Sequence, residues 1–287
     1  KLVDLKFQPG IDKQDTAYSA GDQRKYVDSN FVRFHYGKPE RWKGWSYLPN
    51  PNKAIVGVVR DTHSWIGLDG TRYLALGTDR KLYLYSEGKV YDITPIRETA
   101  SGLSNPFTTN GTTTVTVTDA SHGALVGDFV TFDSFSSIDG LDMNQEFEII
   151  TVPSASTYTV THTSTASGST SGGGGTGNAV YQINTGPSTS TYGYGWNTLT
   201  WNLSTWNTPR SSSNVVVAGR NWSLDNFGED LIATVLDGGT FIKDISGSIT
   251  ARATALSNAP TASRFSLVST DTRHLMIFGT ETTIGNN

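Results

Sequence analysis

The stretch from Tyr73 to Pro95 constrains the fold of this 287-residue chain more than any other. Glycine-containing turns, short enough for hairpins, divide it into three predicted strands. These strands are Tyr73–Leu76, Lys81–Tyr85 and Lys89–Ile93. In the middle strand the leucines point to one face and the tyrosines to the other, because strand side chains alternate. Both faces are apolar or aromatic, so we expect a small sheet covered on both sides, as in a blade of a β-propeller.

Composition points to an all-β protein. Glycine is abundant, aromatic residues reach 11%, charged residues only 17%, and long apolar helical patterns are missing. The net charge of −4 argues against a surface built for nucleic-acid affinity. Without cysteine there is no disulfide or thiolate metal site. No run approaches the ~18 apolar residues of a membrane helix, and no charged-then-apolar leader opens the chain.

An irregular propeller-like body is predicted for residues 54–102 and 187–287. Four strands, the number in one blade, fit between residues 54 and 95. The pattern returns over residues 214–245 and begins a third time at Phe265–Val268. Three blades are fewer than the four to eight of a closed ring. Since the chain also starts without methionine and stops after a strand-like run, we expect it to be part of a longer polypeptide.

Two other segments surround this body. Residues 1–53 are rich in turns, with one strand at Asn30–Tyr36, and predict an extended N-terminal arm that wraps the body. Residues 103–186 shift to Thr, Ser and Gly and predict a small inserted β-domain. Its expected strands are Thr112–Thr118, Asp128–Phe132, Glu146–Thr151, Tyr158–His162 and Ala179–Ile183. The glycine-rich run Gly168–Gly177 predicts a flexible loop tip that buries nothing.

Few patterns suit catalysis or metal binding. The five histidines are scattered without metal-site spacing, so no metal or cofactor site is predicted. Asp225, Glu229 and Asp230 form one acidic cluster, and paired carboxylates can hydrolyse glycosides. The turn residues Asn226 and Gly228 favour a different role, in which these acids cap the backbone before the next strand.

Three tryptophans recur at a spacing of five residues, at Trp196, Trp201 and Trp206. We interpret them as aromatic padding between blades, and a sugar-stacking platform is the alternative. Asp237–Phe241 resembles part of the Asp-box of sialidase propellers, but the preceding serine and the final tryptophan are absent.

Several segments carry a family resemblance. They are Phe7–Ile11, Tyr26–Trp45, Tyr73–Thr78, Tyr91–Pro95, Asn221–Ile232 and, in the predicted insertion, Thr116–Val130. The segments of the arm and body resemble the tail nozzle or hub proteins, of the packaged-DNA stabilisation type, of short-tailed bacteriophages. Thr116–Val130 resembles a β-module of phage tail proteins. The resemblance implies a non-enzymatic virion protein that forms a homo-oligomeric ring, and six subunits are the expected number. It also implies assembly in the host cytoplasm, without membrane insertion, below the portal and adaptor and beside tail-fibre or needle proteins.

The arm holds the predicted contacts to neighbouring proteins. Arg33, Arg41, Trp42 and Trp45 combine charge with aromatic area, the composition of interface anchors. With 22 basic against 26 acidic residues, the chain can line a bore through which double-stranded DNA passes without specific binding. The alternative from another class is a carbohydrate-binding or depolymerase tail protein for receptor recognition, which would use the tryptophan series.

Overall fold

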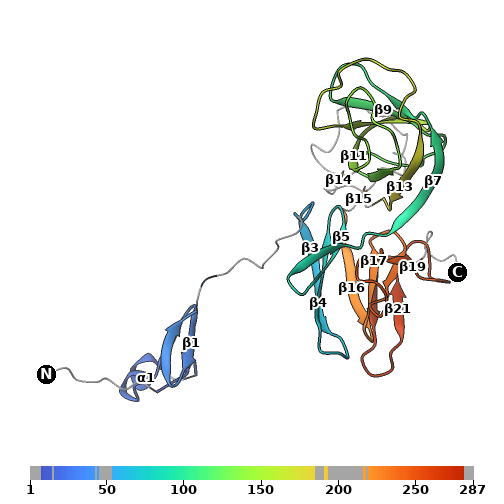
Figure 1. Cartoon of the computed structure of the whole chain (residues 1–287). Coiled ribbons are helices and arrows are strands. Elements are labelled where there is room, and N and C mark those ends of the chain that lie inside the picture. Colours follow the sequence, from blue (N-terminus) through green and yellow to red (C-terminus); the bar gives the residue numbers. More distant parts are fainter. Residues whose placement is uncertain are drawn as a thin grey trace, which may run out of the picture. The chain divides into compact units, whose positions relative to one another are not determined.

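The computed structural model describes residues 8–14, 16–42, 44, 54–184, 191–192, 216–217 and 219–280. Within these residues the only helix is the six-residue α1 (Ala17–Asp22), and all other elements are strands (Figure 1). The all-β prediction is therefore confirmed. The chain divides into two compact units, Lys1–Pro49 and Asn50–Asn287. We call the first of them the N-terminal unit.

The N-terminal unit contains α1 and one hairpin. The hairpin joins β1 (Val32–His35) to β2 (Lys38–Arg41), so the predicted strand is present in shortened form. Its two turn residues, Tyr36 and Gly37, have φ of 48° and 74°, the combination that a type I′ turn requires. The sequence did not predict α1, because a helix this short has no apolar periodicity and gains little from propensity.

The body contains two antiparallel four-stranded sheets with strands in sequence order. The first sheet consists of β3 (Val59–Ile66), β4 (Arg72–Thr78), β5 (Leu82–Ser86) and β6 (Lys89–Asp92). The second sheet consists of β16 (Trp222–Phe227), β17 (Asp230–Val235), β18 (Thr240–Lys243) and β19 (Thr254–Ala255). The apolar residues before Val59 are outside the strand. Among them Ile55 packs on the first sheet, and the backbone N–H of Val56 donates to the Tyr83 hydroxyl at 3.0 Å.

The two sheets pack face to face around one hydrophobic core, formed by residues such as Trp65, Leu84 and Leu231. At its edge the Trp222 ring lies directly against Gly77, where a Cβ atom would come within 2.7 Å of the ring. The Trp222 indole N–H donates to the Thr78 carbonyl at 2.8 Å. Only a residue without a side chain allows this approach, so Gly77 fixes how closely the two sheets pack.

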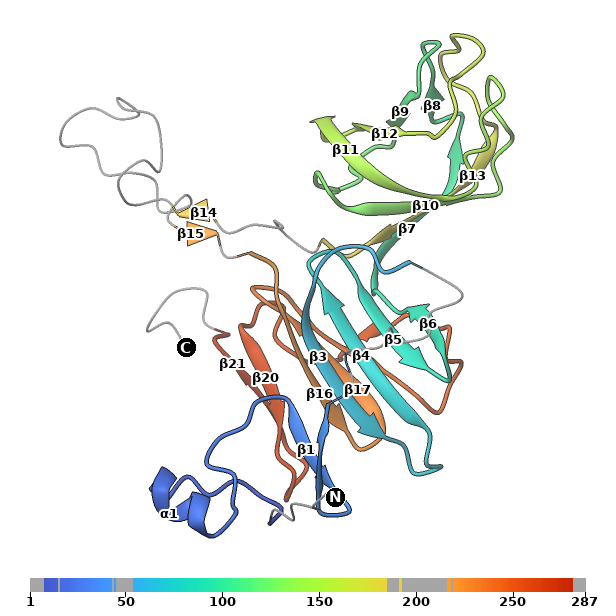
Figure 2. The ribbon, with the colours of Figure 1, turned by 90° about the vertical axis from the view of Figure 1, so that its left-hand side faces the viewer.

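A third sheet has two strands, β20 (Phe265–Val268) and β21 (Leu275–Phe278), and packs beside the second. Figure 2 shows the three sheets side by side. A separate short pair, β14 (Thr191–Tyr192) with β15 (Val216–Val217), falls between the insert and the second sheet in the sequence.

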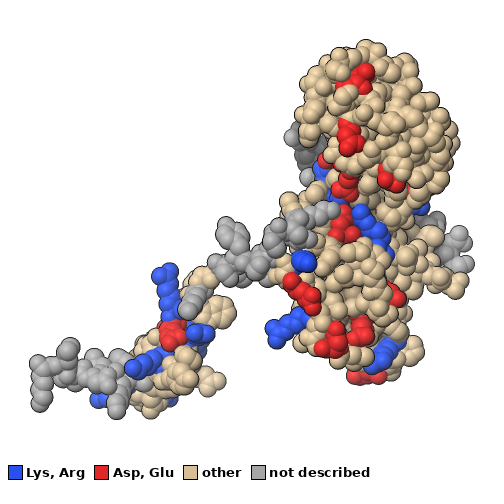
Figure 3. All heavy atoms as spheres, viewed as in Figure 1, with Lys and Arg blue, Asp and Glu red and all other residues tan. Residues whose placement is uncertain are grey.

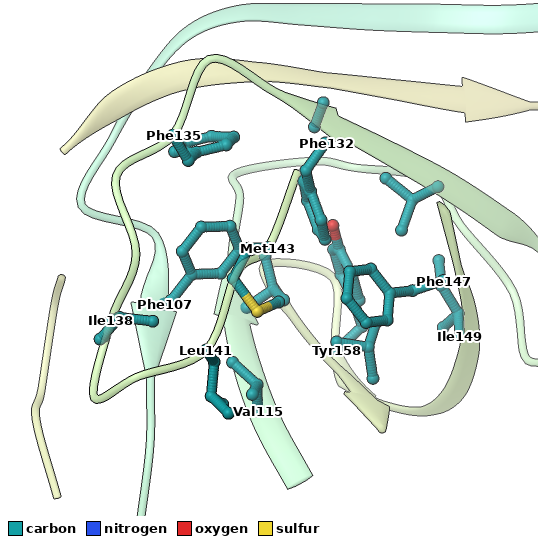
Figure 4. Packing of buried hydrophobic residues seen from close by; sticks show 14 of the residues in the cluster. Phe107, Val115, Phe132, Phe135, Ile138, Leu141, Met143, Phe147, Ile149 and Tyr158 are labelled. Carbon is teal, nitrogen blue, oxygen red and sulfur yellow. The ribbon is translucent and has the colours of Figure 1, made fainter. Parts of the chain in front are cut away.

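The insert, residues 103–186, builds most of a seven-stranded sheet with its own core. The strands are β7 (Ile96–Ser104), β8 (Phe107–Thr108), β9 (Thr114–Thr118), β10 (Phe129–Asp133), β11 (Glu146–Ser154), β12 (Thr157–Thr161) and β13 (Thr176–Gln182). Aromatic residues fill the core, where Phe107 meets Phe132 and Phe135 edge to face (Figure 4). β7 and β13 pair with each other and connect the insert to the body.

The prediction that Gly168–Gly177 forms a flexible tip that buries nothing is wrong. Phe107 exchanges backbone hydrogen bonds with Gly173, at 3.2 and 2.8 Å, and the carbonyl of Gly174 accepts from Ser136 at 2.8 Å. Gly174 is buried against the Phe107 ring with φ of 100°. The glycines therefore allow the backbone to close over the aromatic core, where side chains would not fit.

Candidate functional site

The hairpin of the N-terminal unit exposes large aromatic side chains. Tyr36 is 92% exposed, Phe31 71% and Trp42 61%. The backbone N–H of Trp42 donates to the Phe31 carbonyl at 2.7 Å and holds the ends of the hairpin together. In the described part of this unit only Ala20 is buried. A segment that buries so little and exposes so much aromatic surface is typical of one that packs on a partner.

Charged side chains divide between the two faces of this hairpin. Arg33 Nη2 lies 3.1 Å from Glu40 Oε2, and His35 Nδ1 lies 3.3 Å from Glu40 Oε1. These hydrogen bonds, that of His35 first, lower the pKa of the Glu40 carboxyl. Arg41 follows Glu40 and therefore points to the opposite face. The structure thus separates Arg33 from Arg41, and leaves Arg41 exposed beside Trp42.

The remaining predicted site residues include four tryptophans. Trp45 and the series Trp196, Trp201 and Trp206 are outside the described residues. Within the described ranges, no group of three or more His, Cys, Asp or Glu side chains could hold a metal ion.

The acidic cluster of the second sheet is held by backbone amides. Asp225 Oδ2 accepts from Val268 N at 2.7 Å, and Asp230 Oδ1 accepts from Ile245 N at 3.0 Å. Glu229 Oε1 accepts from the backbone N–H of Leu68. Each acid therefore anchors a segment that is distant in the sequence, whereas the sequence predicted that these acids cap the backbone before the next strand. A local bond is present as well, since Asn226 N donates to Asp225 Oδ1 at 2.8 Å.

A second cluster, which we call the joint cluster, connects the insert to the body. It comprises Lys81, Asp92, Glu146, Gln182 and Arg252. The Nζ atom of fully buried Lys81 lies 3.0 Å from Asp92 Oδ2 and 2.5 Å from Glu146 Oε1. Gln182 Nε2 also donates to Glu146 Oε1, at 2.5 Å, and Arg252 Nη1 lies 2.5 Å from Asp92 Oδ1.

Within the joint cluster, neighbouring charges decide the ionisation of Asp92. Burial alone would raise the pKa of Asp92, but the charges of Lys81 and Arg252 outweigh it and hold the pKa below its usual value. Lys81 Nζ also lies 4.4 Å from the centre of the Phe129 ring, at the base of the insert. Insert and body are therefore connected by buried charges as well as by β7 and β13.

Sequence reasoning missed this cluster, although one signal was available. The insert contains no Lys or Arg, and Figure 3 shows acidic but no basic side chains over its upper part. Its acidic residues are Asp119, Asp128, Asp133, Asp139, Asp142, Glu146 and Glu148. Any Lys or Arg that pairs with them must come from outside the insert. Lys81 does so with Glu146, and Arg80 of the body pairs with Glu148.

Comparisons with known proteins give little beyond the structure itself. No protein-family model and no curated protein matches the sequence. Among solved structures, the chain is similar to the Phage phi92 endosialidase, with 16% sequence identity, 67% of this chain covered and a TM-score of 0.25. The matched region spans 30% of that endosialidase chain. A TM-score this low carries no argument about fold or function.

In the described residues, no helix is both long and apolar enough to cross a lipid bilayer.

Proposed function

We propose that this chain is a structural subunit of a phage tail nozzle or hub. It would form a ring below the portal and adaptor that retains DNA and conducts it outward. The N-terminal unit carries the proposal, because it exposes Phe31, Tyr36 and Trp42 while burying only Ala20 among its described residues. Such a unit gains its stability from assembly, through the aromatic surface that it brings to a partner. The resemblance of Tyr26–Trp45 to the nozzle family supports the same assignment.

The charge distribution suits a conduit. The insert has seven acidic residues and no basic one, so it repels the phosphate backbone. A wall that does not neutralise phosphates releases few counterions, and DNA passes it without being held. Isolated protein should therefore bind duplex DNA no more tightly than a Kd of about 10⁻⁴ M at physiological salt.

A complementation experiment tests the role of the N-terminal unit. Virions are produced from a phage that lacks this gene, with the protein supplied from a plasmid. The double variant Arg41→Ala with Trp42→Ala should be missing from purified virions, and infectivity should fall with it. Arg33→Ala is the matched control, because Arg33 is paired with Glu40 on the hairpin face opposite to Arg41. Circular dichroism verifies that both variants remain folded.

Three results would contradict the proposal. Normal incorporation of the double variant would show that the hairpin is not the attachment surface. Tight DNA binding that is lost in the double variant would show that the arm grips DNA. Hydrolysis of a host polysaccharide that disappears in Glu229→Ala or Trp201→Ala would identify a receptor-directed enzyme instead.

A further inference from the structure

A pocket lies where the seven-stranded sheet of the insert meets the second sheet of the body. Its volume is about 420 Å³, which is within the range of sites that hold small molecules. Most of its wall is apolar, and the apolar side chains include Val235, Phe241, Leu256 and Pro260. The other side of the wall is formed by Arg97 of β7 and by Ile183 and Asn184, which follow β13. The pocket therefore combines an apolar interior with a cationic side chain.

Arg97 uses only part of its hydrogen-bonding capacity within the protein. Its Nη2 donates to the His122 carbonyl at 2.7 Å, and its Nη1 donates to Glu98 Oε2 at 3.2 Å. The guanidinium carbon lies 5.5 Å from the centre of the Tyr181 ring. These contacts fix the position of the guanidinium. Because this group has five N–H donors, others remain for a molecule in the pocket.

A second arginine, Arg220, contacts the wall of the pocket at Asn184. Arg220 is only 7% exposed, and its Nη1 donates to the Asn184 carbonyl at 2.9 Å. In the described part of the chain this is the one hydrogen bond of its guanidinium, and no Asp or Glu oxygen lies within 4.0 Å. Burial lowers the pKa of Arg220 to about 10. Buried charges are normally paired, so Arg220 lacks a counter-ion.

Two carboxylates act on Arg220 at longer range, and each is bound elsewhere. Asp128 Oδ2 accepts from the backbone N–H of Leu125 at 2.8 Å. Burial also raises the pKa of Asp128, which disfavours its charged form. Asp237 Oδ1 lies 3.2 Å from Arg264 Nε. Neither acid therefore neutralises Arg220 directly.

We propose that this pocket binds a small organic anion that has an apolar body. The body lies against Phe241 and Leu256. The head, a carboxylate or a phosphate, lies towards Arg97 and Arg220. A guanidinium suits both heads, because its planar fork can donate two parallel hydrogen bonds to either one. A ligand bound in this way contacts both sheets at once and stabilises the connection between the insert and the body.

Four probe compounds test this recognition by isothermal titration calorimetry on the whole chain at pH 7. Phenylacetate and phenyl phosphate carry both an apolar body and an anionic head. The neutral compound 2-phenylethanol lacks the charge, and acetate lacks the body. We expect at least one of the two complete probes to bind with a Kd below about 1 mM. The neutral and the body-less probes should bind at least about tenfold more weakly, because each loses one half of the recognition.

Substitutions then locate the site. Arg97→Met and Arg220→Met should each weaken binding of the charged probe by about tenfold or more. Ala255→Phe places a large side chain at an exposed position of the wall and should abolish binding. Arg72→Met is the matched control, because Arg72 is exposed on β4 and is not part of the wall. Circular dichroism verifies the fold of each variant, and Arg220→Met should retain it because the change removes a buried charge without a counter-ion.

Several results would overturn the proposal. Equal affinities for phenylacetate, phenyl phosphate and 2-phenylethanol would show that no anion is recognised. Absence of binding by both complete probes up to about 10 mM would show that the pocket is not a ligand site. Wild-type affinity in Arg97→Met, or in Ala255→Phe, would place the bound probe elsewhere, and these two variants decide the question even if Arg220→Met does not fold. The nozzle proposal does not depend on any of these outcomes, because it concerns the N-terminal unit.

Discussion

Replacing Lys81 by methionine should destabilise the chain far more than the same replacement of its neighbour Arg80. Both residues connect the first sheet to a glutamate of the insert, Glu146 for Lys81 and Glu148 for Arg80. They differ in burial, because Lys81 is fully buried whereas the Arg80 side chain is 31% exposed. Comparing the two variants therefore shows how burial changes the contribution of an ion pair between the first sheet and the insert.

The expected loss of unfolding free energy depends on whether the carboxylates that lose their partner are buried and which other partners they retain. Removing one partner of a buried ion pair costs about 3–5 kcal/mol. Asp92 retains Arg252 and Glu146 retains Gln182, so we expect about 2–4 kcal/mol for Lys81→Met. The Arg80–Glu148 pair is partly exposed on both sides, and Arg80→Met should cost about 0.2–1 kcal/mol. Methionine retains most of the apolar stem in both cases.

The pH dependence gives a second readout. The pKa of Asp92 is lowered in the folded chain, so its ionised form stabilises the fold. This contribution is fully present above the unfolded pKa of about 3.9 and is lost as the pH falls through the lower folded value. The difference between wild type and Lys81→Met should therefore be large at pH 7 and should shrink below about pH 4.

Urea unfolding followed by tryptophan fluorescence and circular dichroism measures both effects. If Lys81→Met and Arg80→Met agree within about 0.5 kcal/mol at pH 7, the joint cluster does not stabilise the contact between insert and body. A double-mutant cycle with Glu146→Gln then separates the Lys81–Glu146 interaction from the rest.

Three further changes test the packing. Gly77→Ala should cost about 1–3 kcal/mol in urea unfolding, because the new Cβ would lie 2.7 Å from the Trp222 ring; an unchanged midpoint would contradict the close approach. Gly174→Ala should cost a similar amount, about 1–3 kcal/mol, since φ is positive and the Phe107 ring occupies the space; wild-type thermal stability would argue against a closed glycine segment. Deleting residues 105–175 and joining the ends with Asn-Gly should leave the body folded with a lower melting temperature, because β7 and β13 already pair at that end; complete loss of the sheet signal in circular dichroism would show that the body needs the insert.

Local alternation predicted much of the body. The order of the four strands between residues 54 and 95 followed from period-two patterns and short turns, and the structure has them in that order. The first of these strands was harder to place. Residues 54–66 begin with apolar residues, but the more polar part, Val59–Ile66, is the part that pairs with β4. The apolar start of residues 54–66 does not form a strand because Ile55 packs on the outer face of the first sheet instead. That contact is with residues distant in the sequence, so the local pattern could not show it.

Features that depend on distant neighbours were not predictable. The glycine content indicated that Gly168–Gly177 can adopt unusual backbone conformations. It did not indicate that this segment packs against the Phe107 ring. Lys81, Glu146 and Arg252 come from segments far apart in the sequence, and no local pattern marks a lysine that becomes fully buried. For the hairpin, composition identified Arg33, Arg41 and Trp42 as candidates, whereas the separation of Arg33 from Arg41 requires the strand register.

The pairing of β7 with β13 also determines how the protein bears mechanical load. Because the insert is entered and left through adjacent antiparallel strands, tension between the two ends of the body does not run through the insert's own fold. It acts first where Ile96 lies opposite Gln182 and Ile183 N donates to the Pro95 carbonyl at 3.0 Å. Opening there would unzip the ladder one bond at a time, except that Gln182 is tied to Glu146 and, through it, to Lys81. The contacts of Gln182 and Lys81 with Glu146 thus lie at the end of the ladder where a pulling force would first separate β7 from β13. We expect the insert to stay folded until these contacts break.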